Sequence, residues 1–386
     1  MKSIKLITYV IFVLSITMSV YAQEFVRIGG LFDLSGPASN IGKPSKLVAE
    51  MAVDIVNKEG GFYGREIEFV TMDTKGDPKK ASTNTKKMIF RSKVLALVGP
   101  TRTGCGNTIK SIVHRSKVPT IMLVGGDSVV TDDDEAPAFY IYKTPQRSST
   151  AIKRILTYLK DKKKLKIGLL SGNDFFGKDG RDTISKLAPE FGIQIIAKEE
   201  CKPEDTDLTD VLTKINKDKP DAIVCWTIGP ASPNASICAD KLGLTNSIIQ
   251  CHGVPGPEYI EQAGKSAEGD LMPTTKLLVV DDLPDTDPQK KVIQNFVHLY
   301  KDVYHLDKKF PLNTHSGYAW DAIQLIVYTM KKVGLETDEI REELENTNKY
   351  VGVSGIFNFS ATDHNGLDID SMIMVEVKNG KFVIAK

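Results

Sequence analysis

Strand-like runs alternate with helix-like runs along most of this chain, and that alternation restricts the possible folds more than any other feature. Residues 94–98 form a continuous apolar run, as expected for a parallel strand that is buried on both faces. Segment 43–57 instead spaces its apolar residues at the helical period. Repeated alternation of this kind predicts parallel sheets with helices on both faces. Because 386 residues exceed one ordinary core, we expect an α/β protein with two doubly wound lobes.

The strand–helix pattern restarts after about residue 146. The first series predicts strands at 26–32, 66–72, 94–98 and 120–124. The second series predicts strands at 165–170, 193–197, 222–226 and 247–251. The last third is different, because it predicts long helices at 288–304 and 317–332 and then a hairpin that turns at Asn379-Gly380.

The N-terminus has the pattern of a secretory signal peptide. Lys2 and Lys5 precede an uncharged, mostly apolar run at 6–20, and small residues allow cleavage after Ala22. A short membrane anchor is the alternative, but the run is below the roughly 20 residues that span a bilayer. We therefore expect a signal peptide at 1–22 and an exported, periplasmic protein.

Charge and motifs argue against several classes of function. The 50 Lys and Arg nearly balance the 49 Asp and Glu, whereas nucleic-acid-binding proteins usually carry a basic excess, so we expect no nucleic-acid partner. The six His are scattered without metal-ligand spacing, and no P-loop, GxSxG or HExxH motif is present. We expect no catalytic residue, no metal and no cofactor. The five Cys either form one or two disulfides or remain as small buried side chains.

Five polar or Gly-rich loops directly follow predicted strands. In open α/β sheets, ligands bind beyond the carboxyl ends of the strands, which is where these loops lie. Gly allows a close approach of backbone to ligand, helix-start amides favour an anion, and Arg binds a carboxylate with two parallel hydrogen bonds. Each loop alone is compatible with an ordinary turn, but together they indicate a binding site at 99–104, 124–128, 172–177, 226–231 and 251–254.

Several motifs occur in a characteristic order: Gly-Gly-Leu-Phe-Asp-Leu-Ser-Gly-Pro-Ala at 29–38, Asn-Lys-Glu-Gly-Gly-Phe-Tyr-Gly-Arg at 57–65, and Asp73 with Asp77-Pro78. Val-Gly-Pro at 98–100 and Lys-Thr-Pro at 143–145 follow. Through nearly the whole mature chain, the sequence resembles the substrate-binding proteins of branched-chain amino acid ABC transporters, the type I periplasmic binding proteins.

The resemblance implies two doubly wound parallel-sheet lobes joined by three crossovers, with the ligand clamped between them. The N-terminal lobe would comprise 24–145 and 273–350, and the C-terminal lobe 146–272 and 351–386. The implied function is the solute-binding component of an ABC importer, which performs no chemistry. Its partners would be a small-molecule ligand and a permease in the inner membrane, and we expect a monomer.

The resemblance also implies site residues. Thr103 matches the hydroxyl that holds the ligand carboxylate, and the 124–126 loop matches the segment whose backbone faces the ligand. The remaining positions match further contacts or lie beside the expected site. The full expected set is Ile41, Arg102, Thr103, Val124, Gly125, Gly126, Arg147, Phe176, Pro230 and His252.

Two departures from the family pattern concern the ligand. Amino-acid binders of the family place Glu where this chain has His252 and Asp near Ser148, and those carboxylates pair with the ligand's α-ammonium. An unpaired buried cation costs several kcal/mol. We therefore expect an aromatic or other organic acid, with Arg102 and Arg147 nearby and Phe176 and Trp226 as an apolar wall, although Trp226 fits core packing equally well. A branched-chain or other amino acid, a chemosensory receptor and an exported enzyme remain alternatives.

Overall fold

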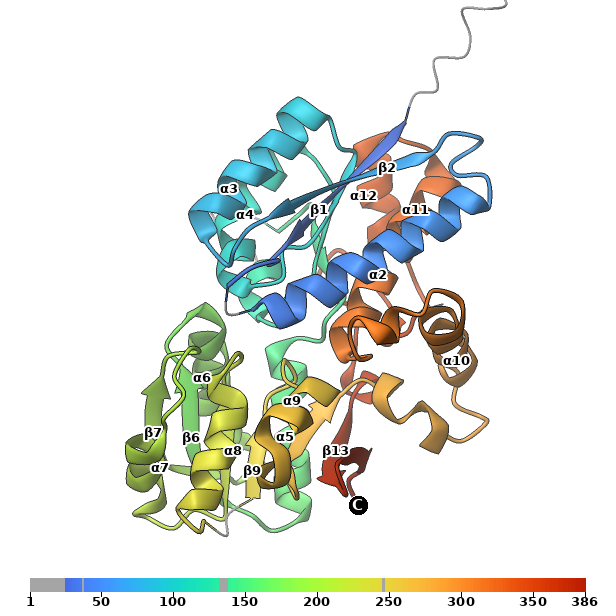
Figure 1. Cartoon of the computed structure of the whole chain (residues 1–386). Coiled ribbons are helices and arrows are strands. Elements are labelled where there is room, and N and C mark those ends of the chain that lie inside the picture. Colours follow the sequence, from blue (N-terminus) through green and yellow to red (C-terminus); the bar gives the residue numbers. More distant parts are fainter. Residues whose placement is uncertain (1–24, 37, 132–137, 245–246) are drawn as a thin grey trace, which may run out of the picture.

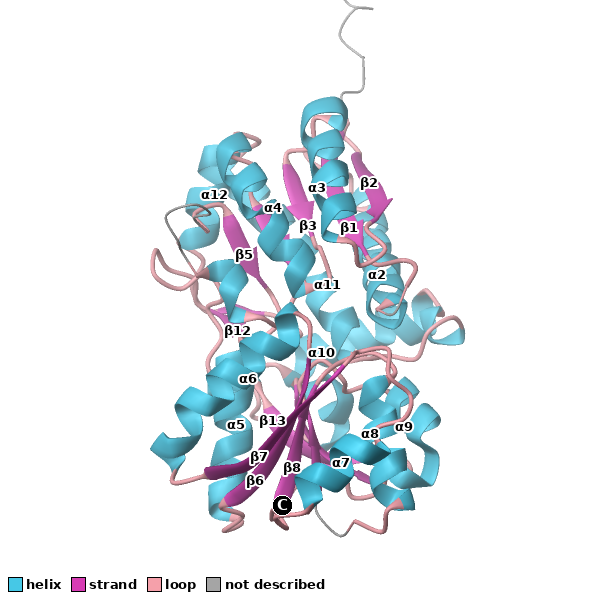
Figure 2. Cartoon of the chain, turned by 90° about the vertical axis from the view of Figure 1, so that its left-hand side faces the viewer, coloured by secondary structure: helices cyan, strands magenta, loops and turns pink. Residues whose placement is uncertain are grey.

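The computed structural model describes residues 25–36, 38–131, 138–244 and 247–386, which form two α/β lobes (Figure 1). The expected signal peptide at 1–22 lies outside the described residues. Each lobe contains a mainly parallel sheet with helices on both faces, so the predicted architecture is confirmed (Figure 2).

The first lobe is built on a five-stranded parallel sheet in the order β2-β1-β3-β4-β5. Its strands are β1 (Val26–Phe32), β2 (Ile67–Asp73), β3 (Ala96–Val98), β4 (Thr120–Met122) and β5 (Ile141–Lys143). Its helices are α2 (Ser39–Lys58), α3 (Pro78–Lys87), α4 (Thr103–Ser116), α10 (Lys290–His298), α11 (Thr314–Val333) and α12 (Thr337–Glu345). As the Asp-Pro pair suggests, the Asp77 carboxylate caps α3 by accepting from the amide of Lys79.

The second lobe is built on a seven-stranded sheet in the order β14-β13-β10-β9-β8-β6-β7. Its strands are β6 (Lys166–Gly172), β7 (Gln194–Cys201), β8 (Ala222–Trp226), β9 (Ser247–Gln250), β10 (Leu271–Thr274), β13 (Ile373–Lys378) and β14 (Lys381–Ile384). Its helices are α5 (Ser148–Asp161), α6 (Phe175–Leu187), α7 (Thr209–Asn216), α8 (Ala231–Lys241) and α9 (Pro257–Ala263). Asn379 and Gly380 both have positive φ in the β13–β14 turn, as a type I′ hairpin requires.

The chain crosses between the lobes three times. The first crossing joins β5 to α5, the second follows β10, and the third lies between Leu367, in the first-lobe core, and Met372, in the second-lobe core. The second and third crossings come later than the boundaries expected at 273 and 351. β10 extends to Thr274 because it pairs with β13, and the β11–β12 hairpin (Tyr350–Val351 and Ile356–Phe357) belongs with the first lobe because Phe357 packs in that core.

The short strands β5 and β10 and the short helix α9 were not predicted. Elements of three to seven residues are too short to show a period, so only their pairing with neighbours defines them. Among the described residues, no helix has the length and apolar character to span a bilayer.

Candidate functional site

A cavity lies between the two lobes, at the carboxyl ends of their strands, where the predicted loops converge. From the first lobe it is lined by Ile41, Thr101, Arg102, Thr103, Leu123, Gly125, His315 and Tyr318. Pro145 from the first crossover and the second-lobe residues Asp174, Phe176, Ile228, His252 and Gly253 complete the lining. Its volume of about 30 Å³ holds about two water molecules, so this is a closed form whose lobes have to separate to admit a solute.

Thr103 places a hydroxyl on the first-lobe wall of this cavity. It is the first residue of α4, so the first amides of that helix have no acceptor within the helix and carry its positive dipole end. The Thr103 side chain is only 3% exposed, and its Oγ1 accepts from the amide of Gly126 at 3.4 Å. A hydroxyl beside a helix start is suited to receive an anionic group.

The 124–126 loop shapes the same wall without side chains of its own. A Cβ at Gly125 would lie 2.5 Å from His252 Nε2, and one at Gly126 would lie 2.5 Å from the Thr103 methyl group. Buried Lys143 holds the loop by donating from Nζ to the carbonyl oxygens of Gly125 (2.7 Å) and Gly126 (3.1 Å). Burial lowers the Lys143 pKa to about 8.

Aromatic rings form the second-lobe wall. The ring centroids of Phe176 and Trp226 lie 5.6 Å apart in a stacked arrangement, and the His252 ring lies 5.7 Å from Phe176 and 5.4 Å from Trp226. Phe176 and His252 line the cavity, whereas Trp226 is completely buried in the second-lobe core. Trp226 therefore supports the wall from behind.

His252 brings an unsatisfied polar group to the cavity. The side chain is 2% exposed, and neither ring nitrogen has a hydrogen-bond partner among the described residues. Burial, with the nearby Lys143 cation, lowers the His252 pKa to about 3. Burial likewise lowers the pKa of His315, which shares a hydrogen bond of 3.3 Å with the Gly253 carbonyl, to about 4. At neutral pH both rings are uncharged, so His252 offers one donor and one acceptor, whereas His315 donates its N–H to the Gly253 carbonyl and offers only an acceptor.

Arg102 lines the cavity but also joins the lobes. Its Nη2 lies 2.8 Å from Oδ2 of Asp174, with side-chain exposures of 16% and 21%. The other Asp174 oxygen accepts from the amide of Gly177 at 2.9 Å and so caps α6. The guanidinium that was expected to grip the ligand is therefore paired with a second-lobe carboxylate in this closed form.

A second contact between the lobes also comes from α6. The Asp179 carboxylate accepts from the first-lobe amides of Asp127 at 3.2 Å and Ser128 at 3.4 Å. Burial raises the Asp179 pKa. Helix α6 and its N-cap thus supply Asp179 and Asp174, which contact the first lobe, and the aromatic ring of Phe176.

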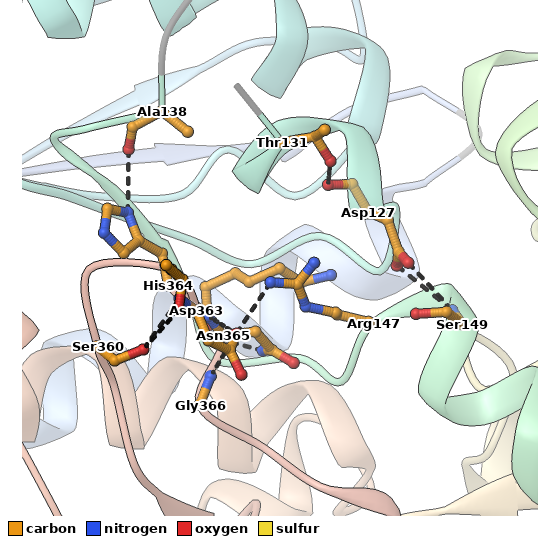
Figure 3. A network of polar contacts seen from close by, with 12 residues as sticks. Asp127, Thr131, Ala138, Arg147, Ser149, Ser360, Asp363, His364, Asn365 and Gly366 are labelled. Carbon is orange, nitrogen blue, oxygen red and sulfur yellow. Dashed lines mark hydrogen bonds and ion pairs between the residues drawn. The ribbon is translucent and has the colours of Figure 1, made fainter. Parts of the chain in front are cut away.

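Four of the expected site residues do not line the cavity. Arg147 points away and donates to Asp363 at 2.9 Å, in the network beside the crossovers (Figure 3). Val124 is buried in a first-lobe core, and Pro230 precedes α8. Gly126 does not line the cavity, but its lack of a side chain leaves room for Thr103. Ser148, near the position where amino-acid binders of the family have Asp, donates to the Gly125 carbonyl oxygen.

Several lining residues were missed in the sequence. Asp174 lies inside the predicted 172–177 loop and could have been found there as the cap of the following helix. Thr101 likewise lies inside the predicted 99–104 loop, and it accepts from the Asp33 amide within the first lobe. His315 and Tyr318 lie on α11, which no strand precedes. Their approach to the cavity depends on how α11 packs, and no local signal reports that.

The five Cys all lie in the described part of the chain, where each is buried and free. The alternative of small buried side chains therefore holds in this structure. Burial raises the pKa of the Cys251 thiol to about 12. Among the described residues, no three His, Cys, Asp or Glu side chains are placed to hold a metal ion.

Residues 26–381 match the family model described as periplasmic binding protein. The chain belongs to this family. Leu/Ile/Val-binding protein BraC3 of Rhizobium johnstonii is 23% identical over 254 residues, which is 64% of this chain and 66% of that protein.

Solved structures agree on the fold. An extracellular ligand-binding receptor from Rhodopseudomonas palustris HaA2 superposes with a TM-score of 0.86 at 23% identity, covering 94% of this chain and all of that one. The branched-chain amino acid transporter substrate-binding protein of Streptococcus pneumoniae, solved with isoleucine, has a TM-score of 0.80 at 26% identity and covers 94% of this chain and 99% of that one. The periplasmic binding protein is therefore similar to the Leu/Ile/Val-binding branch of its family.

Proposed function

We propose that this periplasmic binding protein is the exported solute-binding component of an ABC importer and that it clamps a small organic acid between its lobes. One observation carries the choice of ligand. Among the described residues that line the cavity, Asp174 is the only acid, and its two oxygens are engaged by Arg102 and by the Gly177 amide. Among the described residues that line this cavity, no carboxylate is therefore free to pair with an α-ammonium group.

The remaining polar groups suit an anion. Thr103 and the start of α4 offer hydrogen-bond donors at one end, and neutral His252 offers a ring N–H at the other wall. Phe176 and Ile228 supply apolar contact for the body of the ligand. Contacts from both lobes allow the ligand to shift the population toward the closed form.

An amino acid is the second candidate, because the names of the relatives and the isoleucine complex point to one. In that case a zwitterion would separate the Arg102–Asp174 pair, with Arg102 on its carboxylate and Asp174 on its ammonium. Presentation of the ligand to a chemosensory receptor would use the same clamp.

A thermal-shift screen tests the choice. We expect aliphatic and aromatic monocarboxylates to raise the melting temperature of the mature protein and the branched-chain amino acids to have little effect. Stabilisation by leucine, isoleucine or valine without any response to organic acids would overturn the assignment. Export and a permease partner are tested separately, by cell fractionation and by co-purification of the ligand-loaded protein with its transporter.

A further inference from the structure

A second, polar cavity adjoins the cavity described above, which we call the aromatic cavity because Phe176 lines it. It also lies between the lobes, has a volume of about 30 Å³, and shares Gly253 and His315 with the first cavity as a common wall. We call it the polar chamber. Its polar side chains come from both lobes and include Asn40, Ser232, Glu258, Gln262, Asn313 and His315.

Glu258 gives the polar chamber a negative charge without a counter-charge. The partly buried carboxylate accepts from Asn313 Nδ2 at 3.2 Å, and no described Lys, Arg or His forms an ion pair with it. Burial raises the Glu258 pKa, and the neighbouring Glu261 carboxylate acts in the same direction. A carboxylate in this setting gains most from a cationic partner that arrives with the ligand.

The arrangement of the lobes is compatible with such a partner. Asn313 is 2% exposed and caps α11 through Oδ1, so its amide group is held in place beside Glu258. His315 is the second residue of α11, and it lines both the polar chamber and the aromatic cavity. A ligand that extends past His315 from the first cavity would enter the polar chamber, which Glu258 lines.

We propose that the polar chamber receives the cationic end of the ligand, with Glu258 as its counter-charge and Asn313 as the residue that positions Glu258. The inference rests on the proposed function, since it places the anionic end at Thr103. The ligand class is then an acid whose amino group lies far from its carboxylate, in contrast to an α-amino acid.

Paired titrations test this inference. The affinities of butyrate, pentanoate and hexanoate are compared by calorimetry with those of γ-aminobutyrate, δ-aminovalerate and ε-aminocaproate, with leucine as the α-amino acid. We expect at least one distal amine to improve affinity about tenfold or more over its parent acid, as for a hydrogen bond to a charged group. Glu258→Gln should remove that preference and leave the parent acid unchanged.

Glu261→Gln is the matched control, because it removes the same charge from the same helix at a position that lines a different cavity. It should retain the preference. Parent acids that bind without any gain from the amine, or a gain that survives Glu258→Gln, would overturn the role of Glu258 and leave the proposed function intact. If leucine binds most tightly, or if neither series of acids binds, both the role of Glu258 and the proposed function are overturned. Unchanged affinity for the parent acid shows that the variant is folded.

Discussion

The two lobes present different groups to the cavity between them. The first lobe presents donors, namely the Arg102 guanidinium, the Asp127 and Ser128 amides and the Thr103 hydroxyl at the start of α4. The second lobe presents the acids of α6 and a wall of aromatic rings. The first lobe is thus suited to receive an anion, whether it comes from a ligand or from the second lobe itself.

This contrast gives α6 a double role. Asp174 and Asp179 hold the first lobe, while Phe176 lines the cavity between them and His252. An acidic ligand that uses Arg102 has to share it with Asp174 or displace it. Closure of the lobes and binding of an acidic ligand therefore both use the guanidinium of Arg102. Variants of Arg102 and Asp174 can distinguish its contribution to closure from its contribution to ligand binding.

The largest expected effect is at Arg102. Arg102→Ala should weaken an acidic ligand by roughly tenfold to a hundredfold, because the guanidinium keeps donors that Asp174 does not use, and a hydrogen bond from one of them to the ligand anion is lost. Asp174→Asn keeps an α6 cap but frees the guanidinium, so affinity for the acid should stay the same or rise. Calorimetry on both variants distinguishes the roles, since equal losses would show that Arg102 only joins the lobes.

The next effect is the pH dependence of stability that the neutral, buried His252 causes. The folded pKa of His252, about 3, lies below its ordinary value of 6.5. The unfolded chain therefore binds a proton first, and the wild type should lose stability relative to His252→Gln as pH falls below 6.5. The expected loss is about 1 kcal/mol per pH unit, measured by denaturant unfolding between pH 7 and 5.

The comparison with a variant is essential for this measurement. Burial raises the pKa of Asp270 and Asp321 to about 7, and such groups stabilise the fold as pH falls, which opposes the histidine effect. Those contributions cancel between wild type and His252→Gln. Parallel stability curves for the two proteins would contradict a buried, neutral His252.

The smallest effect is expected at Asp179. Its contacts to the two amides are long, so Asp179→Asn should reduce ligand affinity only severalfold, about 1 kcal/mol, through a less stable closed form. Asp182→Asn removes the same charge from an exposed position of α6 and serves as the control. If both variants behave alike in calorimetry, the contact between Asp179 and the first lobe contributes nothing to closure.

Much of the fold was predicted correctly from local pattern, and six residues of the expected binding set line one cavity, whose role as the binding site stays a prediction. The alternation of elements, the Asp77 cap and the Asn379-Gly380 turn depend on neighbours in sequence. Five strand-following loops were expected at one edge, and Thr103, Gly125, Phe176 and His252 do meet there with Ile41 and Arg102.

The remaining features required the packed molecule. Arg102 and Asp174 are 72 residues apart, and only closure of the lobes brings them within 2.8 Å. Arg147 and Asp363 are 216 residues apart, so an arginine that looked available for a ligand is engaged beside the crossovers. Packing of Phe357 in the first-lobe core places the third crossing after the boundary expected at 351.

The difference between the features that local sequence predicts and those that need the packed molecule has a physical origin. Periodicity, caps and turns arise from backbone geometry over a few residues, so the chain alone specifies two doubly wound lobes with polar and Gly-rich loops at their strand ends. The charge that remains for a ligand depends on which groups neutralise each other after packing. Tertiary structure pairs Arg102 with Asp174, leaves His252 neutral and unpartnered, and leaves Glu258 without a counter-ion among the described residues.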